Sequence, residues 1–451
     1  MVYDTICAIS TAYGEAGIAV IRVSGDQSIR YVNRLFSGEN LAKVSSHTLT
    51  HGWIKDYRNN DLVDEVLVSV MRAPHSFTSE DVVEINCHGG IYITQYIIEL
   101  LLETGARLAE PGEFTKRAYL NGKINLTQAE SIMDMIEAKS KNALVVATQG
   151  LSGGVAQLIS TIKHRLIDII GVIEVNIDYP EYDDVVELTD DVLTPKIFQL
   201  LKQIDDIIEK SQTGLIMKQG VKTAIVGRPN VGKSSLLNLL LAEDKAIVTS
   251  VAGTTRDLVE GTLNVRGLLL HLVDTAGIHS TVDEVEQIGI GRSYNAMDEA
   301  DLVIVVLDYG AKMDQTDQKL LDRVRSKTHI VVVNKVDTPR NTKMIHRPDF
   351  IYLSTLTKAG LEKLQDEIIE KAGVASFHKD ITYLSNTRQI SKLKEARFAL
   401  KEALVSAQAS MPVDIISIDL QASYTALNEI LGVEQTESVI DALFARFCLG
   451  K

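Results

Sequence analysis

The sequence predicts a multidomain protein of mixed α/β and α class, with an N-terminal α/β domain, a discontinuous helical domain and a second α/β domain inserted into the helical one. Three observations lead to this prediction. Alternating β-branched segments lie near the N-terminus, short apolar segments alternate with helical patterns after Gly220, and helical periodicity occupies both the residues before Gly220 and those after residue 374. Because inserted domains tend to have neighbouring termini, the two helical segments are expected to pack together.

Residues 1–118 form the predicted N-terminal α/β domain. Three segments are rich in β-branched residues and alternate in polarity, which is typical of strands: Gly17–Val23, Val63–Val70 and Asp81–Asn86. The apolar segment Ile91–Glu103 has the composition of a helix that ends near Gly105.

The helical domain is predicted in two parts, residues 119–219 and residues 375–451. In both parts, apolar residues recur at helical spacing. The predicted helical segments are Thr127–Asn176, Leu193–Gln212, Ser391–Ser406, Ser417–Leu431 and Glu437–Phe447.

The inserted domain is expected to cover residues 220–374. It contains short apolar segments of the kind that buried parallel strands show, at Val221–Val226, Leu268–Val273, Leu302–Leu307 and Ile330–Val333. Helical patterns lie between them, the first of which is Ser234–Leu241. This alternation predicts a βαβ domain.

The composition is that of a globular protein with an acidic balance. The chain has 451 residues, 45% of them hydrophobic and 24% charged, and a formal net charge of −14. These values exclude disorder of the whole chain and suggest about three domains. An acidic chain has no overall attraction to nucleic acid, so any RNA contact needs a partner or a local basic patch. The candidates for such a patch are Lys116, Arg117 and Lys123, or Lys392, Lys394 and Arg397.

The expected compartment is the cytoplasm. No apolar segment approaches the roughly 20 residues that span a bilayer, and the N-terminus lacks the pattern of a secretory signal, so no membrane partner is expected. Cys7, Cys87 and Cys448 lie far apart and form no CxxC pair. This spacing argues against a zinc site and a disulfide framework.

The segment Gly227–Ser234 reads GRPNVGKS and fits the phosphate-binding pattern GxxxxGK[ST], with a predicted strand before it and a helix after it. Loop N–H groups and the helix N-terminus form an anion site in this motif. Lys233 is therefore expected to hold the β- and γ-phosphates as a catalytic group, and the Ser234 hydroxyl to ligate Mg²⁺.

Three further motifs favour a guanine nucleotide and an inserted Ras-like P-loop G domain. Gly253–Arg256 forms a polar switch loop whose Thr255 would reach Mg²⁺, and Asp274–Gly277 reads DTAG after an apolar strand. Asn334–Asp337 reads NKVD, in which the Asp337 carboxylate can accept both N–H groups of the guanine edge. A fifth motif is weak, since only Ser354 fits it.

Position 278 raises a question about the chemistry. Ras-type enzymes carry a Gln here that orients the attacking water, whereas this chain has Ile278. Either hydrolysis is slow, or another side chain positions the water. Asp283 and Glu284 are interpreted as a solvated acidic loop.

The P-loop, the switch Gly253–Asp257 and the C-terminal Phe447–Lys451 together resemble the MnmE (TrmE) family of tRNA-modification GTPases, and the resemblance covers the whole chain. It implies an N-terminal dimerising and folate-binding domain, a discontinuous helical domain and an inserted TrmE-type G domain. It also implies that a homodimer acts with a flavoprotein, MnmG, in a hetero-oligomer. Together they would hydrolyse GTP and add a carboxymethylaminomethyl group at C5 of the wobble uridine of certain tRNAs.

The resemblance implies specific site residues. A folate, 5-formyl-tetrahydrofolate or a relative, would be bound by Arg22, Glu84, Lys123 and Lys451, the last of them across a dimer interface. Hydrolysis would be stimulated by K⁺ held by Asn230, Thr249, Val251 and Thr254, with Glu286 orienting water. The residues expected to contact GTP are Asn230, Val231, Gly232, Lys233, Ser234, Ser235, Thr249, Ser250, Val251, Ala252, Gly253, Thr254, Thr255, Asp274, Thr275, Ala276, Gly277, Asn334, Lys335, Asp337 and Ser354. Cys448 is implied in modification without a stated role.

Plainer interpretations stay open for several of these residues. Arg22 and Glu84 suit a cross-strand surface pair, Asn230 a residue that caps a turn, and Cys448 a buried small apolar residue. Two other functions are also compatible with the sequence. One is a regulatory GTP-binding switch of the ribosome-assembly type, and the other is a folate-dependent one-carbon transferase with a structural G domain.

Overall fold

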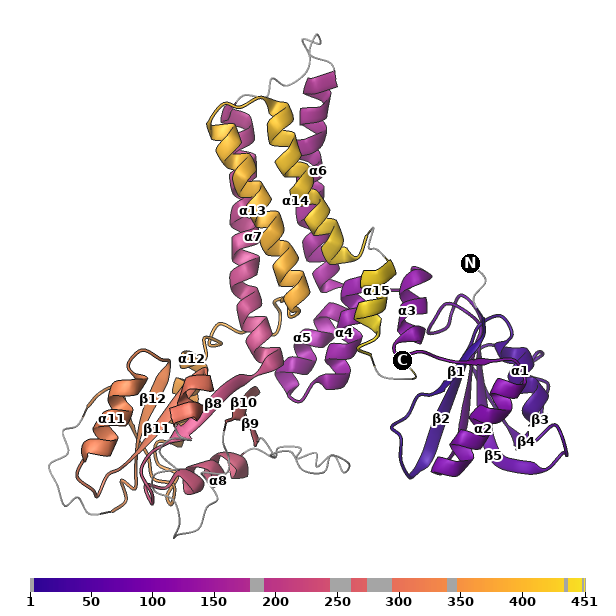
Figure 1. Ribbon diagram of the computed structural model, residues 1–451, viewed down its shortest axis with the longest axis horizontal. Helices are drawn as coiled ribbons and strands as arrows, with labels where there is room; N and C mark the ends of the chain where they lie inside the picture. Colours follow the sequence, from indigo (N-terminus) through magenta and orange to yellow (C-terminus); the bar gives the residue numbers. More distant parts are fainter. Residues whose placement is uncertain are drawn as a thin grey trace. The chain divides into compact units, whose positions relative to one another are not determined.

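The computed structural model of the chain describes residues 4–178, 190–243, 261–273, 294–338, 347–433, 437–447 and 450. The chain forms two compact units, one of Met1–Met133 with Asn428–Lys451 and one of Asp134–Leu427. The elements of both units are labelled in Figure 1. The segment boundaries expected after residues 118, 219 and 374 stay predictions.

A seven-stranded sheet forms the centre of the first unit, in the order β3-β4-β5-β6-β2-β1-β7. Neighbouring strands are antiparallel except for β1 and β7, which are parallel. The strands are β1 (Ile6–Ile9), β2 (Ala16–Ser24), β3 (Phe36–Gly38), β4 (Thr48–Lys55), β5 (Leu62–Met71), β6 (Val82–Gly89) and β7 (Arg107–Leu108).

Two helices cover one face of this sheet: α1 (Ser28–Leu35) and α2 (Ile91–Glu103). Their apolar residues, among them Val32 and Leu100, join the inward side chains of the strands in one buried cluster. The strands and the helix predicted from periodicity are confirmed, and β1, β3, β4, β7 and α1 are additional elements.

The C-terminal helix of the chain packs on the segment that follows the sheet. The elements involved are α3 (Glu113–Leu120), α4 (Leu126–Glu137) and α15 (Glu437–Phe444). Ala129, Ile440, Phe444 and Phe447 form their apolar cluster. Gly112 has a φ of +72°, and a Cβ there would lie 2.4 Å from the carbonyl oxygen of Phe444, so only glycine permits this approach. This contact holds Phe444 and Phe447 against the start of α3.

The second unit contains long helices from both sides of the insertion. They are α5 (Lys141–Leu151), α6 (Gly154–Asp178), α7 (Asp190–Gln219), α13 (Thr387–Gln408) and α14 (Val413–Leu431). Figure 1 shows α7 and α13 side by side, although the inserted domain separates them in sequence. The buried face of α13 includes Leu393, Ala396, Leu400 and Ala403, at the spacing of a helix that packs on a neighbour. The predicted discontinuous helical domain is confirmed.

Within the described residues, no single helix is long and apolar enough to cross a membrane. The two helices α5 and α6, which are bent by 51° at the break between them, are together long and apolar enough to cross one by length and composition alone.

The inserted domain is a six-stranded sheet in the order β13-β12-β11-β8-β10-β9, parallel except for β9 against β10. Helices α8 and α12 contribute to the core on one face and α11 to the core on the other. This strand order, with helices on both faces, confirms the predicted Ras-like G domain. Its elements are β8 (Val221–Val226), α8 (Lys233–Glu243), β9 (Thr262–Val265), β10 (Leu268–Leu272), β11 (Leu302–Asp308), α11 (Gln315–Val324), β12 (His329–Asn334), β13 (Phe350–Tyr352) and α12 (Leu361–Lys371).

One carboxylate joins the two segments that lead into and out of the insertion. Asp134, on α4, forms an ion pair with Nζ of Lys218 at 2.6 Å. It also accepts a hydrogen bond from Oγ of Ser385 at 3.3 Å. Lys218 lies in the last turn of α7, just before β8, and Ser385 precedes α13. Close packing of Gly214 against Tyr383 brings the same two segments together.

Candidate functional site

The P-loop connects β8 to α8 at the carboxyl ends of the parallel strands, where ligands of such sheets bind. Its backbone has positive φ at Gly227, Asn230 and Gly232, with values of 155°, 63° and 99°. A Cβ on Gly232 would lie 2.2 Å from Nδ2 of Asn334, which itself donates to the carbonyl oxygen of Val231 at 3.1 Å. The loop and the NKVD motif are therefore in direct contact, and glycine is required at the contact.

Lys233 lies at the start of α8, inside this loop. Its Nζ donates to the carbonyl oxygens of Gly227 at 2.8 Å and of Arg228 at 2.9 Å. Burial lowers the pKa of Lys233, because a low-dielectric site disfavours the charged form. Ser234 and Ser235 follow it in the first turn of the helix and are exposed. A cation, a helix N-terminus and a glycine cradle fit a bound phosphate chain.

The NKVD motif, which follows β12, contacts residues that follow β13. Asn334 is fully buried and its Oδ1 accepts the backbone N–H of Thr355 at 3.2 Å. Asp337 is exposed and accepts a hydrogen bond from Oγ of Ser354 at 2.5 Å, and the same Oγ accepts the N–H of Thr357 at 3.0 Å. The structure thus brings Ser354, from the weak fifth motif, beside Asp337.

Lys335 fastens the P-loop from the side of the NKVD motif. Its Nζ donates to the carbonyl oxygen of Asn230 and pairs with Oδ2 of Asp308, both at 2.6 Å. The backbone of Asn230 is therefore held by a lysine. Its exposed side chain makes no hydrogen bond to the residues that the structure describes, so its amide oxygen suits a ligand role.

Many predicted site residues lie outside the described residues, and their positions stay predictions. They are Thr249, Ser250, Val251, Ala252, Gly253, Thr254, Thr255, Asp274, Thr275, Ala276, Gly277, Ile278, Glu286, Cys448 and Lys451.

The predicted folate residues of the N-terminal domain converge on one place. Arg22 and Glu84 are register partners on β2 and β6, and both Nε and Nη2 of Arg22 contact Oε1 of Glu84, at 2.9 and 2.8 Å. Their side chains are 15% and 25% exposed, so this cross-strand pair is half-buried. The Arg22 guanidinium lies 4.8 Å from the ring centroid of Phe77 and 5.6 Å from that of Phe114.

Lys123 and the C-terminal tail reach the same place. Nζ of Lys123 donates to the carbonyl oxygen of Ser76 and lies 5.7 Å from the ring centroid of Phe77, and burial lowers the pKa of Lys123. The carbonyl oxygen of Gly450 accepts hydrogen bonds from Oγ of Ser10 at 3.0 Å and from Nη1 of Arg22 at 3.5 Å. Gly450 contacts Ser10 and Arg22 of its own chain, and the expectation that Lys451 completes the site across a dimer interface stays a prediction.

Sequence reasoning missed the two aromatic rings beside Arg22 and the serine hydroxyl that contacts the tail. Phe77, Phe114 and Ser10 carried no predicted role. Phe77 lies one residue after Ser76, which contacts Lys123, and Phe114 lies in the first turn of α3.

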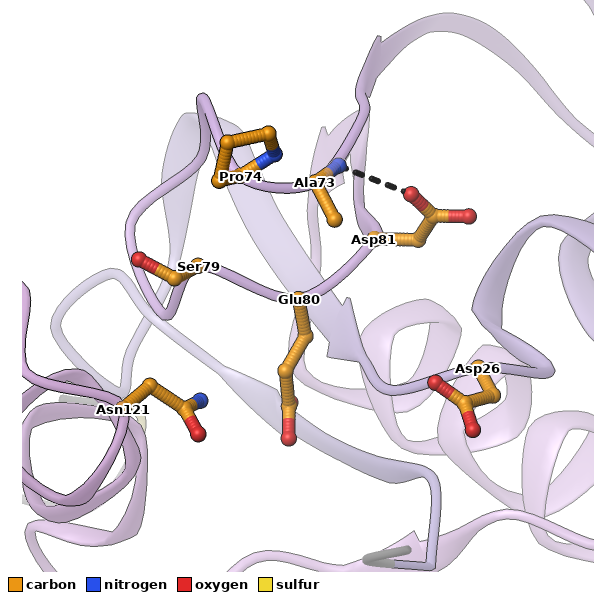
Figure 2. Close-up of a pocket in the computed structure, with 7 residues that line it drawn as sticks. All are labelled: Asp26, Ala73, Pro74, Ser79, Glu80, Asp81 and Asn121. Atoms are coloured by element: carbon orange, nitrogen blue, oxygen red, sulfur yellow. Dashed lines mark hydrogen bonds between the residues drawn. The ribbon is translucent and has the colours of Figure 1, made fainter.

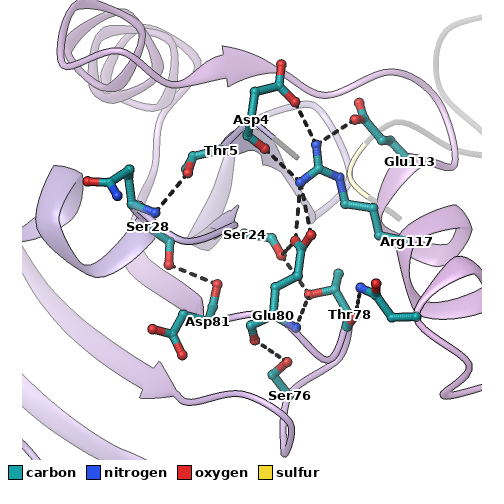
Figure 3. A network of polar contacts seen from close by, with 12 residues as sticks. Asp4, Thr5, Ser24, Ser28, Ser76, Thr78, Glu80, Asp81, Glu113 and Arg117 are labelled. Atoms are coloured by element: carbon teal, nitrogen blue, oxygen red, sulfur yellow. Dashed lines mark hydrogen bonds and ion pairs between the residues drawn. The ribbon is translucent and has the colours of Figure 1, made fainter. Parts of the chain in front are cut away.

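Arg117 was a candidate for RNA contact, and this prediction is wrong. Its side chain is 2% exposed, and it donates to the carbonyl oxygen of Asp4 at 2.7 Å and pairs with Glu80 and Glu113 (Figure 3). A buried guanidinium is stable only when carboxylates and carbonyls satisfy it. Other candidates are paired as well: Lys116 with Asp441, Lys392 with Glu395 and Arg397 with Asp205.

A cleft of about 480 Å³ lies beside this buried network. Figure 2 shows that its lining combines three acidic side chains, Asp26, Glu80 and Asp81, with Asn121 and the Ala73–Pro74 turn. Oδ1 of Asp81 accepts the backbone N–H of Ala73 at 2.9 Å. Carboxylates in the lining disfavour anionic ligands such as phosphates.

Two family models match the chain. The "GTP-binding protein TrmE N-terminus" matches residues 5–123, and the "MnmE helical domain" matches residues 126–448. Among curated proteins, the tRNA modification GTPase MnmE of Bacillus cytotoxicus is 47% identical over 458 residues, and that of Acholeplasma laidlawii is 48% identical over 452 residues. Each match covers 100% of both chains.

Solved structures resemble parts of the chain. The G domain of the T. maritima FeoB iron transporter is 27% identical and covers 34% of this chain and 99% of its own, with a TM-score of 0.25. Aquifex aeolicus Era is 25% identical and covers 40% of this chain and 66% of its own, with a TM-score of 0.26. TM-scores this low add nothing to the strand order described above.

Proposed function

We propose, for a chain that belongs to the MnmE family of tRNA modification GTPases, that its GTP hydrolysis drives the addition of a carboxymethylaminomethyl group at C5 of the wobble uridine of certain tRNAs. The chain is a GTP hydrolase. In the proposed reaction it acts as a homodimer in the cytoplasm, together with a flavoprotein of the MnmG type.

The observation that supports this proposal best is the presence of two constellations in one chain. Arg22 and Lys123 both lie beside Phe77 and Gly450 contacts Arg22, while Asn334 and Lys335 hold an intact P-loop. A ribosome-assembly switch has no use for the first constellation. A one-carbon transferase with a structural G domain has no use for the second.

In the G domain, a GTPase of this kind binds GTP with Mg²⁺, and we assign Lys233 to the β- and γ-phosphates and Ser234 with Thr255 to the metal. We further propose K⁺ stimulation, with Asn230, Thr249, Val251 and Thr254 as ligands and Glu286 as the residue that orients water. A monovalent cation beside the phosphates would supply the positive charge that an arginine finger supplies in related enzymes.

In the N-terminal domain, we assign Arg22, Glu84, Lys123 and Lys451 to 5-formyl-tetrahydrofolate or a related folate, which would supply a one-carbon unit when bound. Both contacts from Arg22 go to Oε1 of Glu84, so Oε2 is the atom suited to accept the N–H donors of a pterin edge. Lys123 and Lys451 provide the cations that a glutamate tail favours.

The charges of the chain support a divided recognition of tRNA. Lys116 and Arg397 are tied to carboxylates, and Arg117 is buried. A chain with a net charge of −14 is poorly suited to hold RNA alone. We therefore propose that the flavoprotein partner makes much of the RNA contact.

The test is the wobble-uridine content of tRNA, measured by nucleoside mass spectrometry in cells that lack this protein. Complementation with the parent chain should restore the modified nucleoside, whereas Lys233→Ala and Arg22→Ala should each fail to restore it. If cells that lack the protein contain as much of the modified nucleoside as wild-type cells do, the ribosome-assembly alternative would be favoured. Full restoration by Lys233→Ala would favour a transferase that does not use GTP.

A further inference from the structure

Arg228, the second residue of the P-loop, contacts the N-terminus of α11. Its Nε donates to Oδ1 of Asp317 at 2.9 Å, its Nη2 lies 2.8 Å from Oδ2 of the same carboxylate, and its Nη1 lies 2.9 Å from Oδ2 of Asp314. The two parallel contacts to Asp317 form a fork, the strongest arrangement between arginine and a carboxylate. A residue of the phosphate loop is thus tied to a helix 89 positions further along the chain.

Asp317 needs this cation because it is buried. Its side chain is 1% exposed, and burial raises the pKa of its carboxyl group. Asp314 caps α11 by accepting the N–H groups of Thr316 and Asp317 at 2.8 and 3.0 Å, and Asp317 accepts the N–H of Asp314 at 3.3 Å in return. The capping box fixes the positions of both carboxylates, so the two partners of Arg228 are held in place by the helix backbone.

The loop that Arg228 belongs to has an unfavourable backbone. Positive φ values at a non-glycine residue, here 63° at Asn230, persist only when surrounding contacts hold them. Lys335 holds the carbonyl oxygen of Asn230 from the side of β12. Arg228 holds the opposite end of the loop, and its own carbonyl oxygen accepts from Nζ of Lys233 at 2.9 Å.

We propose that Arg228 is a positioning residue of the nucleotide site: its fork to Asp317 holds the P-loop in the conformation that receives phosphates. A loop ordered in advance loses less conformational freedom when the nucleotide binds, so the contact increases affinity without touching the ligand. The inference rests on nucleotide binding at the P-loop, which the proposed function shares.

The first test is the dissociation constant of a fluorescent GDP for Arg228→Ala in the full-length chain. Loss of charge-assisted hydrogen bonds of this kind should weaken binding about tenfold to a hundredfold. Arg228→Lys keeps the charge but not the fork, so it should recover only part of the affinity. The matched control is Arg325→Ala, which removes an exposed arginine paired with Asp322 at the other end of α11 and should bind GDP as the parent does.

Asp314→Asn keeps the test decisive if Arg228→Ala does not fold. Asparagine caps a helix as well as aspartate does, so α11 is retained while one contact to Arg228 loses its charge. The variant should raise the dissociation constant about threefold to tenfold. It should also raise KM for GTP more than it lowers kcat, which a general loss of stability would not do.

Parent affinity in folded Arg228→Ala, or in Asp314→Asn, would overturn the proposal. Failure of the parent itself to bind GDP would instead contradict the proposed function, so the two failures are distinguishable.

Discussion

Gly232 and Asn334 approach so closely that a Cβ on Gly232 would lie 2.2 Å from Nδ2 of Asn334. The two residues are 102 positions apart in sequence, and their contact joins the P-loop directly to the NKVD motif. Because Asn334 is fully buried and also bonds Val231 and Thr355, it has no room to withdraw.

Gly232→Ala should therefore weaken GDP binding about a hundredfold or more, because the added methyl group displaces Asn334 and the backbone has a φ of 99° that alanine disfavours. Isothermal titration calorimetry would measure the dissociation constant for GDP. Gly373→Ala is the matched control: Gly373 also has a positive φ, 71°, but a Cβ there meets nothing within 4 Å. An equally large loss of GDP affinity in Gly373→Ala would show that the effect does not depend on the contact between Gly232 and Asn334.

Asp337→Asn should reduce GTP affinity about tenfold to a hundredfold. The variant loses one acceptor for the two guanine N–H groups and presents a mismatched donor, which costs about 1–3 kcal/mol. Ser354→Ala, which removes the hydroxyl that donates to Asp337, should have a smaller effect in the same direction. Competition binding with GTP and xanthosine triphosphate would measure both, and unchanged GTP affinity of Asp337→Asn would refute the assignment of the NKVD motif.

GTP turnover should rise strongly in K⁺ relative to Na⁺ at matched ionic strength, and Asn230→Ala should remove that difference. The side-chain oxygen of Asn230 is the proposed ligand, while its backbone is held separately by Lys335. Asn230→Gly is a second variant. It also removes the side-chain oxygen, but glycine adopts a φ of 63° without strain, so the loop backbone is kept. Equal rates of the parent in both salts would reject K⁺ stimulation and leave GTP hydrolysis itself unaffected.

Deletion of Gly450 and Lys451 should weaken binding of 5-formyl-tetrahydrofolate, because it removes a cation and the tail that contacts Ser10 and Arg22. Calorimetry of the full-length chain and of the truncated one would test this. If the truncated chain hydrolyses GTP as the full-length chain does, its G domain is folded. Identical folate affinities would exclude the tail from the site.

Asp134→Asn should lower the free energy of unfolding by about 1–3 kcal/mol, because it breaks a half-buried ion pair with Lys218. The substitution keeps an acceptor for Ser385, so the effect isolates the charge. Asp298→Asn, which neutralises an exposed pair with Arg323, should cost less than about 1 kcal/mol. Urea unfolding followed by circular dichroism would compare them, and equal losses would contradict a special role of Asp134 at the entrance to the inserted domain.

The local spacing of apolar residues was sufficient to predict the helices and strands with strong periodicity. The strand Val221–Val226 and the helix Ile91–Glu103 lie where their apolar spacing predicts them, since burial of one face follows directly from period. The strand Thr48–Lys55 carried no prediction although its residues alternate, because Gly52 interrupts it and its partner β5 supplies the pairing that stabilises it. The order of P-loop and NKVD along the chain was likewise sufficient for a nucleotide-binding βαβ domain.

Contacts between distant residues required the tertiary structure. The sequence by itself determined which residues could carry chemistry: Lys233, Asp337, Arg22 and Lys123 are readable as motif members. Only the folded chain decided that Arg117 is buried among carboxylates, that Gly450 returns to Arg22 across 428 positions, and that Arg228 is anchored to Asp317. The physical reason is that hydrophobic periodicity is a local property of the chain, whereas the partner of a buried charge is selected by packing, which brings together residues that no sequence interval relates.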